Sequence, residues 1–371
     1  MRDLFLLDPK VIFLNHGSFG ACPKEVFDHY QSWQRALETQ PVAFLGRRAP
    51  ELIQKALSDL GQYLGTSGEN LVFVANATSG LNTVARSLKL SHGDEILTTD
   101  HEYGALELTW QYHQRERGIH IQHQTLPLPM LNEDDVVEAI WSGVTARTRV
   151  IFLSHITSPT ALILPVQEIC RRAREAGIIT IIDGAHVPGQ IPLNLDELGA
   201  DFYSGNCHKW MSSPKGSAFL YVNPDYHEMI DPLVISWGWD GDTLFERTKW
   251  QGTRDISAYL SMPEAIRFME KHDWDTVRAN CHELAIETMH RICEVTGMSP
   301  IAMPRFFGQM VAAPLPPDID VVELKNNLYD EYNVEVPIFS HHDNNYTRVS
   351  IQAYNTRQDI DTFIRGLAVL L

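Results

Sequence analysis

Two ionisable side chains in the middle of the chain stand where covalent chemistry on a bound ligand would need them. Asp183 directly follows the apolar run Ile178–Ile182, and a carboxylate at the carboxyl end of a buried strand faces ligands at the sheet edge. Lys209 follows a second apolar segment. A lysine partly removed from water has a lowered pKa and becomes an amine nucleophile that can form a Schiff base. Lys215 competes for that role, and a turn aspartate and solvated surface lysines are the non-catalytic alternatives.

A phosphate site is indicated by the residues that follow the apolar run Leu71–Ala75. The sequence there passes through small polar residues, among them Thr78 and Ser79, and then becomes helical. Helix N-termini bind phosphate through free N–H groups and the helix dipole, and the two hydroxyls would add donors. A plain helix cap is the alternative. Arg348, near the C-terminus, would hold a substrate carboxylate through two parallel hydrogen bonds, unless it is a surface arginine.

Taken together, these groups match the needs of one cofactor. A helix N-terminus for a phosphate, a carboxylate for a pyridine nitrogen and a lysine for an aldehyde are what pyridoxal 5'-phosphate requires. The sequence contains neither GxGxxG nor GxxxxGK[ST], so a nucleotide-binding protein of those types is not expected.

The elements that must position these side chains alternate between strand-like and helix-like segments. A helical segment, Val166–Ala176, ends at Gly177 and separates two β-branched apolar runs. Such alternation is typical of a mostly parallel sheet that is covered by helices on both faces. The expected strands are Leu71–Ala75, Glu95–Thr98, Val150–Leu153 and Ile178–Ile182.

The pattern changes after about residue 255, which indicates a second, smaller α+β domain. Long helical segments cover Ser257–Glu294, and short strands are expected near Gln309–Ala313 and Arg348–Gln352. A final helix is expected from about Thr356, with Asn355 as its cap. The predicted division assigns residues 20–255 to a large cofactor-binding domain and residues 1–19 and 256–371 to a small domain.

Composition excludes several classes of protein. The 371 residues carry a net charge of −17 and are 44% hydrophobic, which is ordinary for a globular chain and unfavourable for non-specific binding of nucleic acid or anionic membranes. The 5 cysteines form no CxxC pair, so neither a disulfide framework nor a zinc ribbon is indicated. With no signal peptide or membrane helix in the sequence, a cytoplasmic location is expected.

Seven motifs in order give the chain a resemblance to the class V aminotransferase family of fold type I pyridoxal-phosphate enzymes, and within it to the isopenicillin N epimerase-like group. The resemblance covers nearly the whole length. It implies an α/β fold of fold type I with a smaller α+β domain. The motifs are LNHGSFG at 14–20, NATSG at 76–80, HEYGA at 101–105, DGAH at 183–186, GNCHKW at 205–210 with PKG at 214–216, WQGTRD at 250–255, and Arg348-x-Ser-x-x-x-Tyr354-Asn355.

The resemblance implies a role for each residue that matches a family position. Lys209 would form the internal aldimine and then move the Cα proton, and Asp183 would keep the pyridine nitrogen protonated. His186 would lie near the phenolic oxygen, and Tyr103 would stack on the ring, with His101 as the competing choice. The remaining implied cofactor-binding residues are Thr78, Ser79, Ser158, Asn206 and His208.

Substrate and partner contacts are implied in the same way. Thr253 matches a residue that reaches the phosphate of the neighbouring subunit, which implies a homodimer with shared active sites. Arg348 would bind the substrate α-carboxylate, and Asn15 and His16 would lie near the substrate entrance. Whether Arg47, Arg48 or His341 contacts substrate is left open. No metal is expected, because the His341-His342-Asp343 segment lacks partners at ligand spacing.

One departure from the family bears on the reaction. Cysteine desulfurases carry a nucleophilic cysteine on the loop before the carboxylate-binding arginine, and here residues 336–346 contain none. Cysteine desulfuration is therefore disfavoured. The expected reaction is Cα deprotonation of an amino acid or an amino-acid-derived metabolite, as in the epimerase-like group. A C–S lyase, a class V aminotransferase and a non-catalytic cofactor-binding scaffold are the alternatives.

Overall fold

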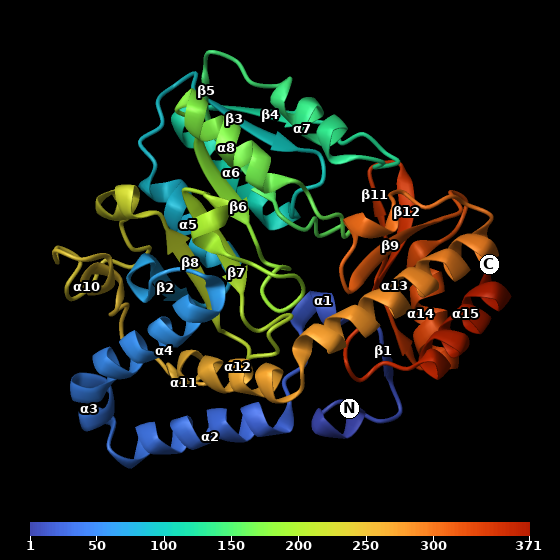
Figure 1. The fold of residues 1–371 in the computed structure, drawn as a ribbon, viewed down its shortest axis with the longest axis horizontal. Helices are drawn as coiled ribbons and strands as arrows, with labels where there is room; N and C mark the ends of the chain where they lie inside the picture. The colour runs from blue at the N-terminus through green and yellow to red at the C-terminus, as the bar shows by residue number, and fades with distance from the viewer.

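A seven-stranded sheet organises the larger part of the protein, whose computed structural model describes residues 1–371 (Figure 1). The strand order is β2-β8-β7-β6-β5-β3-β4. All neighbours are parallel except β8, which runs antiparallel to β2 and β7. The strands are β2 (Leu71–Val74), β3 (Glu95–Thr99), β4 (His120–Gln124), β5 (Thr148–Ser154), β6 (Ile179–Asp183), β7 (Phe202–Asn206) and β8 (Ala218–Val222).

Both faces of this sheet are buried, as the apolar runs predict. In β5, Val150 and Phe152 belong to one hydrophobic core, and the alternate residues Ile151 and Leu153 belong to the other. Because successive side chains of a strand point to opposite faces, an unbroken apolar run needs a layer of helices on each side. The helices between the strands are α5 (Ala77–Ser87), α6 (Gly104–Arg117), α7 (Glu133–Trp141), α8 (Val166–Ala176) and α9 (Leu195–Leu198).

The N-terminal segments run along the lower side of the molecule in Figure 1 and connect its two parts. Strand β1 (Ile12–Phe13) pairs with β10 (Val334–Glu335) of the C-terminal part. Helices α11 (Ser257–Leu260) and α12 (Met262–Lys271) pack on α2 and α4. The other N-terminal elements are η1 (Arg2–Leu4), α1 (His16–Phe19), α2 (Lys24–Thr39), α3 (Pro41–Ala43), the π-helical turn η2 (Phe44–Arg48), α4 (Ala49–Leu64) and η3 (Gly68–Asn70).

A three-stranded antiparallel sheet forms the C-terminal part, in the order β11-β12-β9. Its strands are β9 (Met310–Leu315), β11 (Ile338–His341) and β12 (Asn344–Ser350). The helices of this part are α13 (Trp274–Thr296), α14 (Val321–Tyr332) and α15 (Arg357–Leu370). The short elements η4 (Pro224–Met229), α10 (Leu244–Thr248) and η5 (Pro304–Phe306) complete the chain. No helix is apolar over a length that would let it cross a bilayer.

Two details of the C-terminal part differ from the sequence prediction. The cap of the final helix is Thr356, because its hydroxyl accepts a hydrogen bond from the N–H of Asp359 while the Asp359 carboxylate accepts one from the N–H of Thr356. Asn355 instead donates its amide to the Phe13 carbonyl. The predicted strand Arg348–Gln352 ends earlier, at Ser350, and begins at Asn344, since its polar first residues pair with β11 in a hairpin.

Candidate active site

A cavity of 360 Å³ lies beyond the carboxyl ends of the parallel strands, where several predicted site residues come together. The loops after β5, β6 and β7 and the N-terminus of α5 form its wall. Its residues are Ser18, Phe19, Ala75, Asn76, Ala77, Thr78, Tyr103, Ser154, Ile156, Ser158, Asp183, Ala185, His186, Asn206, His208, Lys209 and Gly216.

The N-terminus of α5 forms one end of the cavity. Asn76 caps the helix by accepting the N–H of Ser79 at 2.8 Å, and the Asn206 side chain from β7 accepts the N–H of Ala77 at 2.8 Å. Thr78 lines the cavity. The Ser79 hydroxyl is turned back to Asn76 at 3.0 Å, and Ser79 does not line the cavity. The N–H groups of Ala77, Ser79 and Gly80 already have acceptors, so this end offers the N–H and the hydroxyl of Thr78 to an anion.

Lys209 reaches the cavity from the loop after β7. Its Nζ lies 3.1 Å from His186 Nε2. Burial and the Arg348 guanidinium lower the pKa of Lys209, and Asp183 opposes them. Burial also raises the pKa of Asp183, while a hydrogen bond from the Ala185 N–H, at 2.8 Å, and the charge of Lys209 oppose the rise. The cavity therefore holds an amine with a lowered pKa and a buried carboxyl group.

Lys215, the competing lysine, is engaged elsewhere. Its Nζ donates a hydrogen bond to the Gly20 carbonyl at 2.9 Å, and Lys215 is absent from the cavity wall. Gly20 has φ of +69° and a Cβ there would lie 2.0 Å from the His208 carbonyl oxygen, so the N-terminal segment packs directly on the loop that carries Lys209. The geometry favours Lys209 as the reactive amine.

Arg348 extends from β12 to the boundary between this cavity and an outer cleft of 670 Å³. One of its terminal nitrogens donates to the Ser158 hydroxyl at 3.2 Å, and the other donates to the Ser18 hydroxyl at 3.2 Å. Its Nε is buried without a partner. Burial lowers its pKa to about 10, so it remains a cation at neutral pH. A carboxylate would supply the missing acceptor.

The outer cleft shares Tyr103 and Ser158 with the inner cavity. Tyr103 is 45% exposed and stands at the start of α6, so its ring is available to a ligand on one side. His341, the last residue of β11, lines the cleft, and its ring centroid lies 5.1 Å from that of His101. His101, the alternative to Tyr103, is buried and hydrogen-bonds Asp100 through Nδ1 at 2.7 Å, and it lines neither space.

Other predicted site residues do not line the inner cavity. Asn15 donates to Glu335 at 2.9 Å. His16 is fully buried between Tyr354, whose hydroxyl lies 2.9 Å from Nδ1, and the Lys209 carbonyl, 2.9 Å from Nε2. His16 therefore packs against the Lys209 loop, whereas the Asn15 amide oxygen accepts from the Ser18 hydroxyl, which in turn accepts from Arg348.

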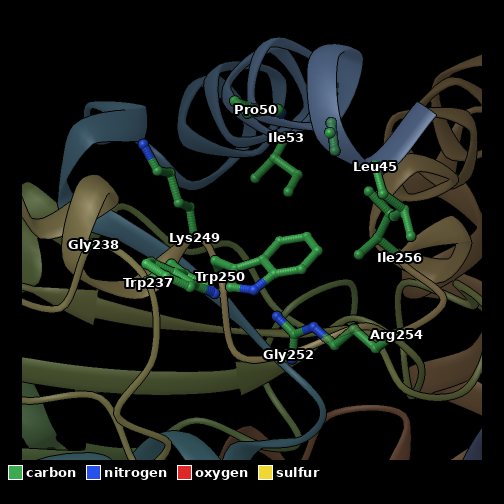
Figure 2. A pocket seen from close by; sticks show the side chains of 12 residues that line it. Leu45, Pro50, Ile53, Trp237, Gly238, Lys249, Trp250, Gly252, Arg254 and Ile256 are labelled. Carbon is green, nitrogen blue, oxygen red and sulfur yellow. The ribbon is translucent and has the colours of Figure 1, made fainter. Parts of the chain in front are cut away.

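Thr253 lies beside a different space, an apolar cavity of 440 Å³ between the segment 237–256 and the η2–α4 region. Figure 2 shows Trp250 in this cavity, with Ile53 and Ile256 around it. Gly252 and Arg254, the neighbours of Thr253, are part of its wall. Arg47 and Arg48 lie in the turn η2 near it.

Two buried side chains at the site were not singled out from the sequence. Glu102, beside Tyr103, accepts hydrogen bonds from the Thr99 hydroxyl and from both the N–H and the hydroxyl of Ser154. Trp210, next to Lys209, donates its indole N–H to His186 Nδ1 at 3.3 Å. Both residues belong to the family motifs. Their partners Ser154 and His186 lie far away in the sequence, so no local pattern indicates these contacts.

The residues of the inner cavity fit pyridoxal 5'-phosphate. A helix N-terminus for the phosphate, the Asp183 carboxyl for the pyridine nitrogen and the Lys209 amine for the aldehyde lie around one space, and the unpartnered Nε of Arg348 lies at its outer boundary. These are different chemical requirements, and the same cavity region meets each of them.

Comparison with known proteins gives an independent result. A family model described as aminotransferase class-V matches residues 12–363. The chain is 36% identical to an isopenicillin N epimerase of Amycolatopsis lactamdurans, over 100% of this chain and 97% of that one. It is 24% identical to a hercynylcysteine sulfoxide lyase of Schizosaccharomyces pombe, over 97% and 94% of the two chains. A solved structure of a lysine-to-alanine mutant of C-DES, with glycine linked to its pyridoxal-phosphate cofactor, has the same fold, with a TM-score of 0.87 at 19% identity over 100% of both chains.

Proposed function

The chain belongs to the class V aminotransferase family and is a pyridoxal-phosphate-dependent enzyme, and from this premise we propose that its reaction begins with removal of the Cα proton of an amino acid. One observation supports this proposal above all. The amine of Lys209 and the carboxyl of Asp183 line the inner cavity, and the guanidinium of Arg348 lines the adjoining outer cleft, which shares Tyr103 and Ser158 with that cavity.

Each side chain has a task that follows from its surroundings. When bound, pyridoxal phosphate supplies an electron sink that is conjugated to the substrate Cα. Asp183 holds a proton at the pyridine nitrogen, and Thr78 with the α5 N-terminus binds the phosphate. Tyr103, which lines both the cavity and the cleft, would pack against the ring. The remaining proposed cofactor contacts are Ser79, Ser158, His186, Asn206 and His208.

Arg348 and Lys209 act on the substrate. The two Arg348 nitrogens that bond Ser158 and Ser18 are held in place, so the guanidinium presents a fixed fork to the α-carboxylate. That contact orients the Cα–H bond. The pKa of the Lys209 amine is lowered by burial, so a fraction of it is unprotonated near neutral pH and can accept the proton from Cα.

Three reactions share this first step. The 36% identity to an epimerase over the full length supports epimerisation, which returns a proton to the other face of Cα. Epimerisation needs a second acid, and the cavity wall offers only Tyr103 in addition to Asp183, His186, His208 and Lys209. Elimination of a β-sulfur group needs no second acid at Cα, and the similarity to a sulfoxide lyase supports that alternative. A class V transamination, which returns the proton to the cofactor, is the third outcome.

One experiment separates these outcomes. Purified enzyme with bound cofactor is incubated in D₂O with cystine, cysteine sulfoxide conjugates and a panel of L-amino acids. Chiral analysis with deuterium at Cα identifies epimerisation, pyruvate with ammonia identifies elimination, and a keto acid without ammonia identifies transamination. If no substrate in the panel exchanges its Cα proton although cofactor is bound, the proposal fails for these substrates and the non-catalytic scaffold gains support.

We further propose that the enzyme is a cytoplasmic homodimer with shared active sites. The support is four exposed apolar side chains in one short segment, Val234, Ile235, Trp237 and Trp239, of which Trp237, 83% exposed, lines the cavity of Figure 2. Such a patch is unusual on the surface of a monomer. Thr253 stands beside the same cavity, between Gly252 and Arg254 of its wall, and its proposed role is to reach the phosphate of the second subunit.

The division into a large domain of residues 20–255 and a small domain of residues 1–19 and 256–371 is likewise a proposal. The β1–β10 pairing supports joining the N-terminus to the small domain. Helices α11 and α12, however, pack on α2 and α4 of the large domain.

A further inference from the structure

Two buried side chains and a half-buried lysine form a series that ends at the reactive amine. The indole N–H of Trp210 lies 3.3 Å from Nδ1 of His186, and Nε2 of the same imidazole lies 3.1 Å from Nζ of Lys209. Trp210 is fully buried and His186 is 3% exposed, so water does not compete strongly for either contact. The protons in this series can therefore be assigned from the chemistry of each group.

An indole nitrogen can only donate a hydrogen bond, so His186 Nδ1 must carry the lone pair that accepts it. A neutral imidazole with an unprotonated Nδ1 carries its proton on Nε2. That Nε2–H points at Lys209 Nζ and needs a lone pair there. Only the neutral amine has one, because an ammonium group has three donors and no acceptor.

The opposite arrangement produces a conflict. An ammonium at Lys209 would donate to His186 Nε2, and the imidazole would then carry its proton on Nδ1. That proton would face the indole N–H of Trp210, and two buried donors would be left against each other. The Trp210 contact therefore favours the neutral amine at Lys209.

The surroundings keep His186 from resolving the conflict by taking a second proton. Burial lowers its pKa well below the ordinary value, and the nearby positive charges of Lys209 and Arg348 act in the same direction, as does His16. Around Lys209, Arg348 also disfavours the ammonium form, and Asp183 is the one facing group that favours it. Trp210 itself is held by the His16 ring, with 4.9 Å between the ring centroids.

We propose that Trp210 is a positioning residue that fixes the tautomer of His186 and thereby holds Lys209 as the free amine that attaches the cofactor. This inference rests on the proposed role of Lys209. Burial of a tryptophan does not by itself require a partner for the indole N–H. Trp110, another buried tryptophan of the same part of the chain, has none. The hydrogen bond of Trp210 is therefore a specific feature of this site.

The test uses the full-length chain, freed of cofactor by dialysis, and the Trp210→Phe variant, which keeps the aromatic packing and removes the N–H. Pyridoxal phosphate is added at a series of pH values, and the rate of its covalent attachment, a condensation that releases one water, is followed by absorbance. Loss of one hydrogen bond that opposes the ammonium should move the half-maximal rate upward by about one pH unit, a roughly tenfold loss of rate on the acid side. Trp110→Phe is the matched control and should leave the midpoint unchanged.

Equal midpoints in wild type and Trp210→Phe, or equal shifts in the two variants, would overturn the proposal. If Trp210→Phe does not fold, nitrogen-15 NMR of histidine-labelled wild type gives a direct answer, with His186→Gln to assign the signal. A protonated Nε2 and an unprotonated Nδ1 support the proposal, and the reverse refutes it. This measurement does not depend on cofactor chemistry, so attachment at a residue other than Lys209 would refute the proposed function without deciding the tautomer.

Discussion

Ser154 and Glu102 form a hydrogen bond that joins the inner cavity to the outer cleft. The Ser154 hydroxyl lines the inner cavity and donates to a Glu102 carboxyl oxygen at 2.6 Å, and Glu102 is part of the wall of the outer cleft. Ser154 is also the residue of β5 that pairs with Asp183 of β6. Two buried carboxyl groups therefore lie near each other, one on each side of Ser154.

This arrangement predicts an unusual pH dependence of stability. Burial, with the charge of Asp183, raises the pKa of Glu102 from 4.5 to about 8, although hydrogen bonds from Ser154 and Thr99 oppose the rise. Between these pH values the unfolded chain loses a proton that the folded protein keeps, so stability falls as the pH rises and the slope ends above about 8. The loss attributable to Glu102 is on the order of 5 kcal/mol at most.

Glu102→Gln tests this expectation, because its amide oxygen can accept from Ser154 and its amide nitrogen can donate to the Thr99 hydroxyl. Urea unfolding at a series of pH values should show less loss of stability between pH 5 and pH 8 than in wild type. Glu95→Gln is the contrast. Hydrogen bonds from Thr145 and Arg147 lower the pKa of Glu95, so removing its charge should lower stability at neutral pH. Parallel stability curves for wild type and Glu102→Gln would mean that Glu102 is ionised over this whole range.

Substitutions of the two lysines near the site should have opposite effects on cofactor attachment. Lys209→Ala should abolish covalent attachment of pyridoxal phosphate, because no other amine lines the cavity. Lys215→Ala should retain it and lose about 1 kcal/mol of stability with the hydrogen bond to the Gly20 carbonyl. Borohydride reduction followed by peptide mass mapping measures the attachment. Pyridoxyl mass on a peptide of the Lys209→Ala protein would refute the assignment.

The planar guanidinium of Arg348 should matter more for substrate binding than for the chemical step. Arg348→Lys keeps the positive charge but cannot hold Ser158, Ser18 and a carboxylate at the same time, so KM should rise by about 10- to 100-fold, with a smaller change in kcat. Arg357→Lys, on the exposed surface, is the control.

The same variant offers an internal check on the cause of that effect. With an amino-acid amide in place of the acid, wild type and Arg348→Lys should differ by much less, because the carboxylate is missing from both complexes. An equal loss on the acid and on the amide would show that the substitution disturbs the site rather than the carboxylate contact.

Much of the fold could be predicted because it depends on local patterns. The helix Val166–Ala176 has the predicted bounds, and Gly177 adopts the left-handed conformation, with φ of +67°, that a helix end requires. The runs before Asp183 and around Phe152 are strands because their β-branched and aromatic residues fill both cores. The predicted helical region Ser257–Glu294 is broken into α11, α12 and α13, since its turns depend on packing against α2 and α4.

The site was less predictable where contacts join distant segments. Lys209, Asp183 and Thr78 line one cavity, and the motifs placed each of them at the end of a strand or the start of a helix. That Arg348 is held by Ser18 and Ser158, or that His16 binds the Lys209 carbonyl, depends on how distant segments of the chain meet. No spacing in the sequence encodes such a contact. The same limit concealed the Trp210–His186 hydrogen bond.

The proposed dimer with shared sites can be tested by complementation. Wild type should sediment at twice the 42.1 kDa of one chain, and Trp237→Asp should dissociate it, because an ionised carboxylate would be buried where the exposed indole packs. Thr253→Ala should weaken cofactor binding if the hydroxyl reaches the neighbouring phosphate. Lys209→Ala and Thr253→Ala chains, co-expressed with different tags and purified as a mixed dimer, should then regain one site of wild-type affinity, since the first chain supplies Thr253 to the intact Lys209 of the second. A mixed dimer whose single site binds cofactor as weakly as the Thr253→Ala homodimer would place Thr253 in its own subunit's site, and a monomeric wild type would refute the shared site altogether.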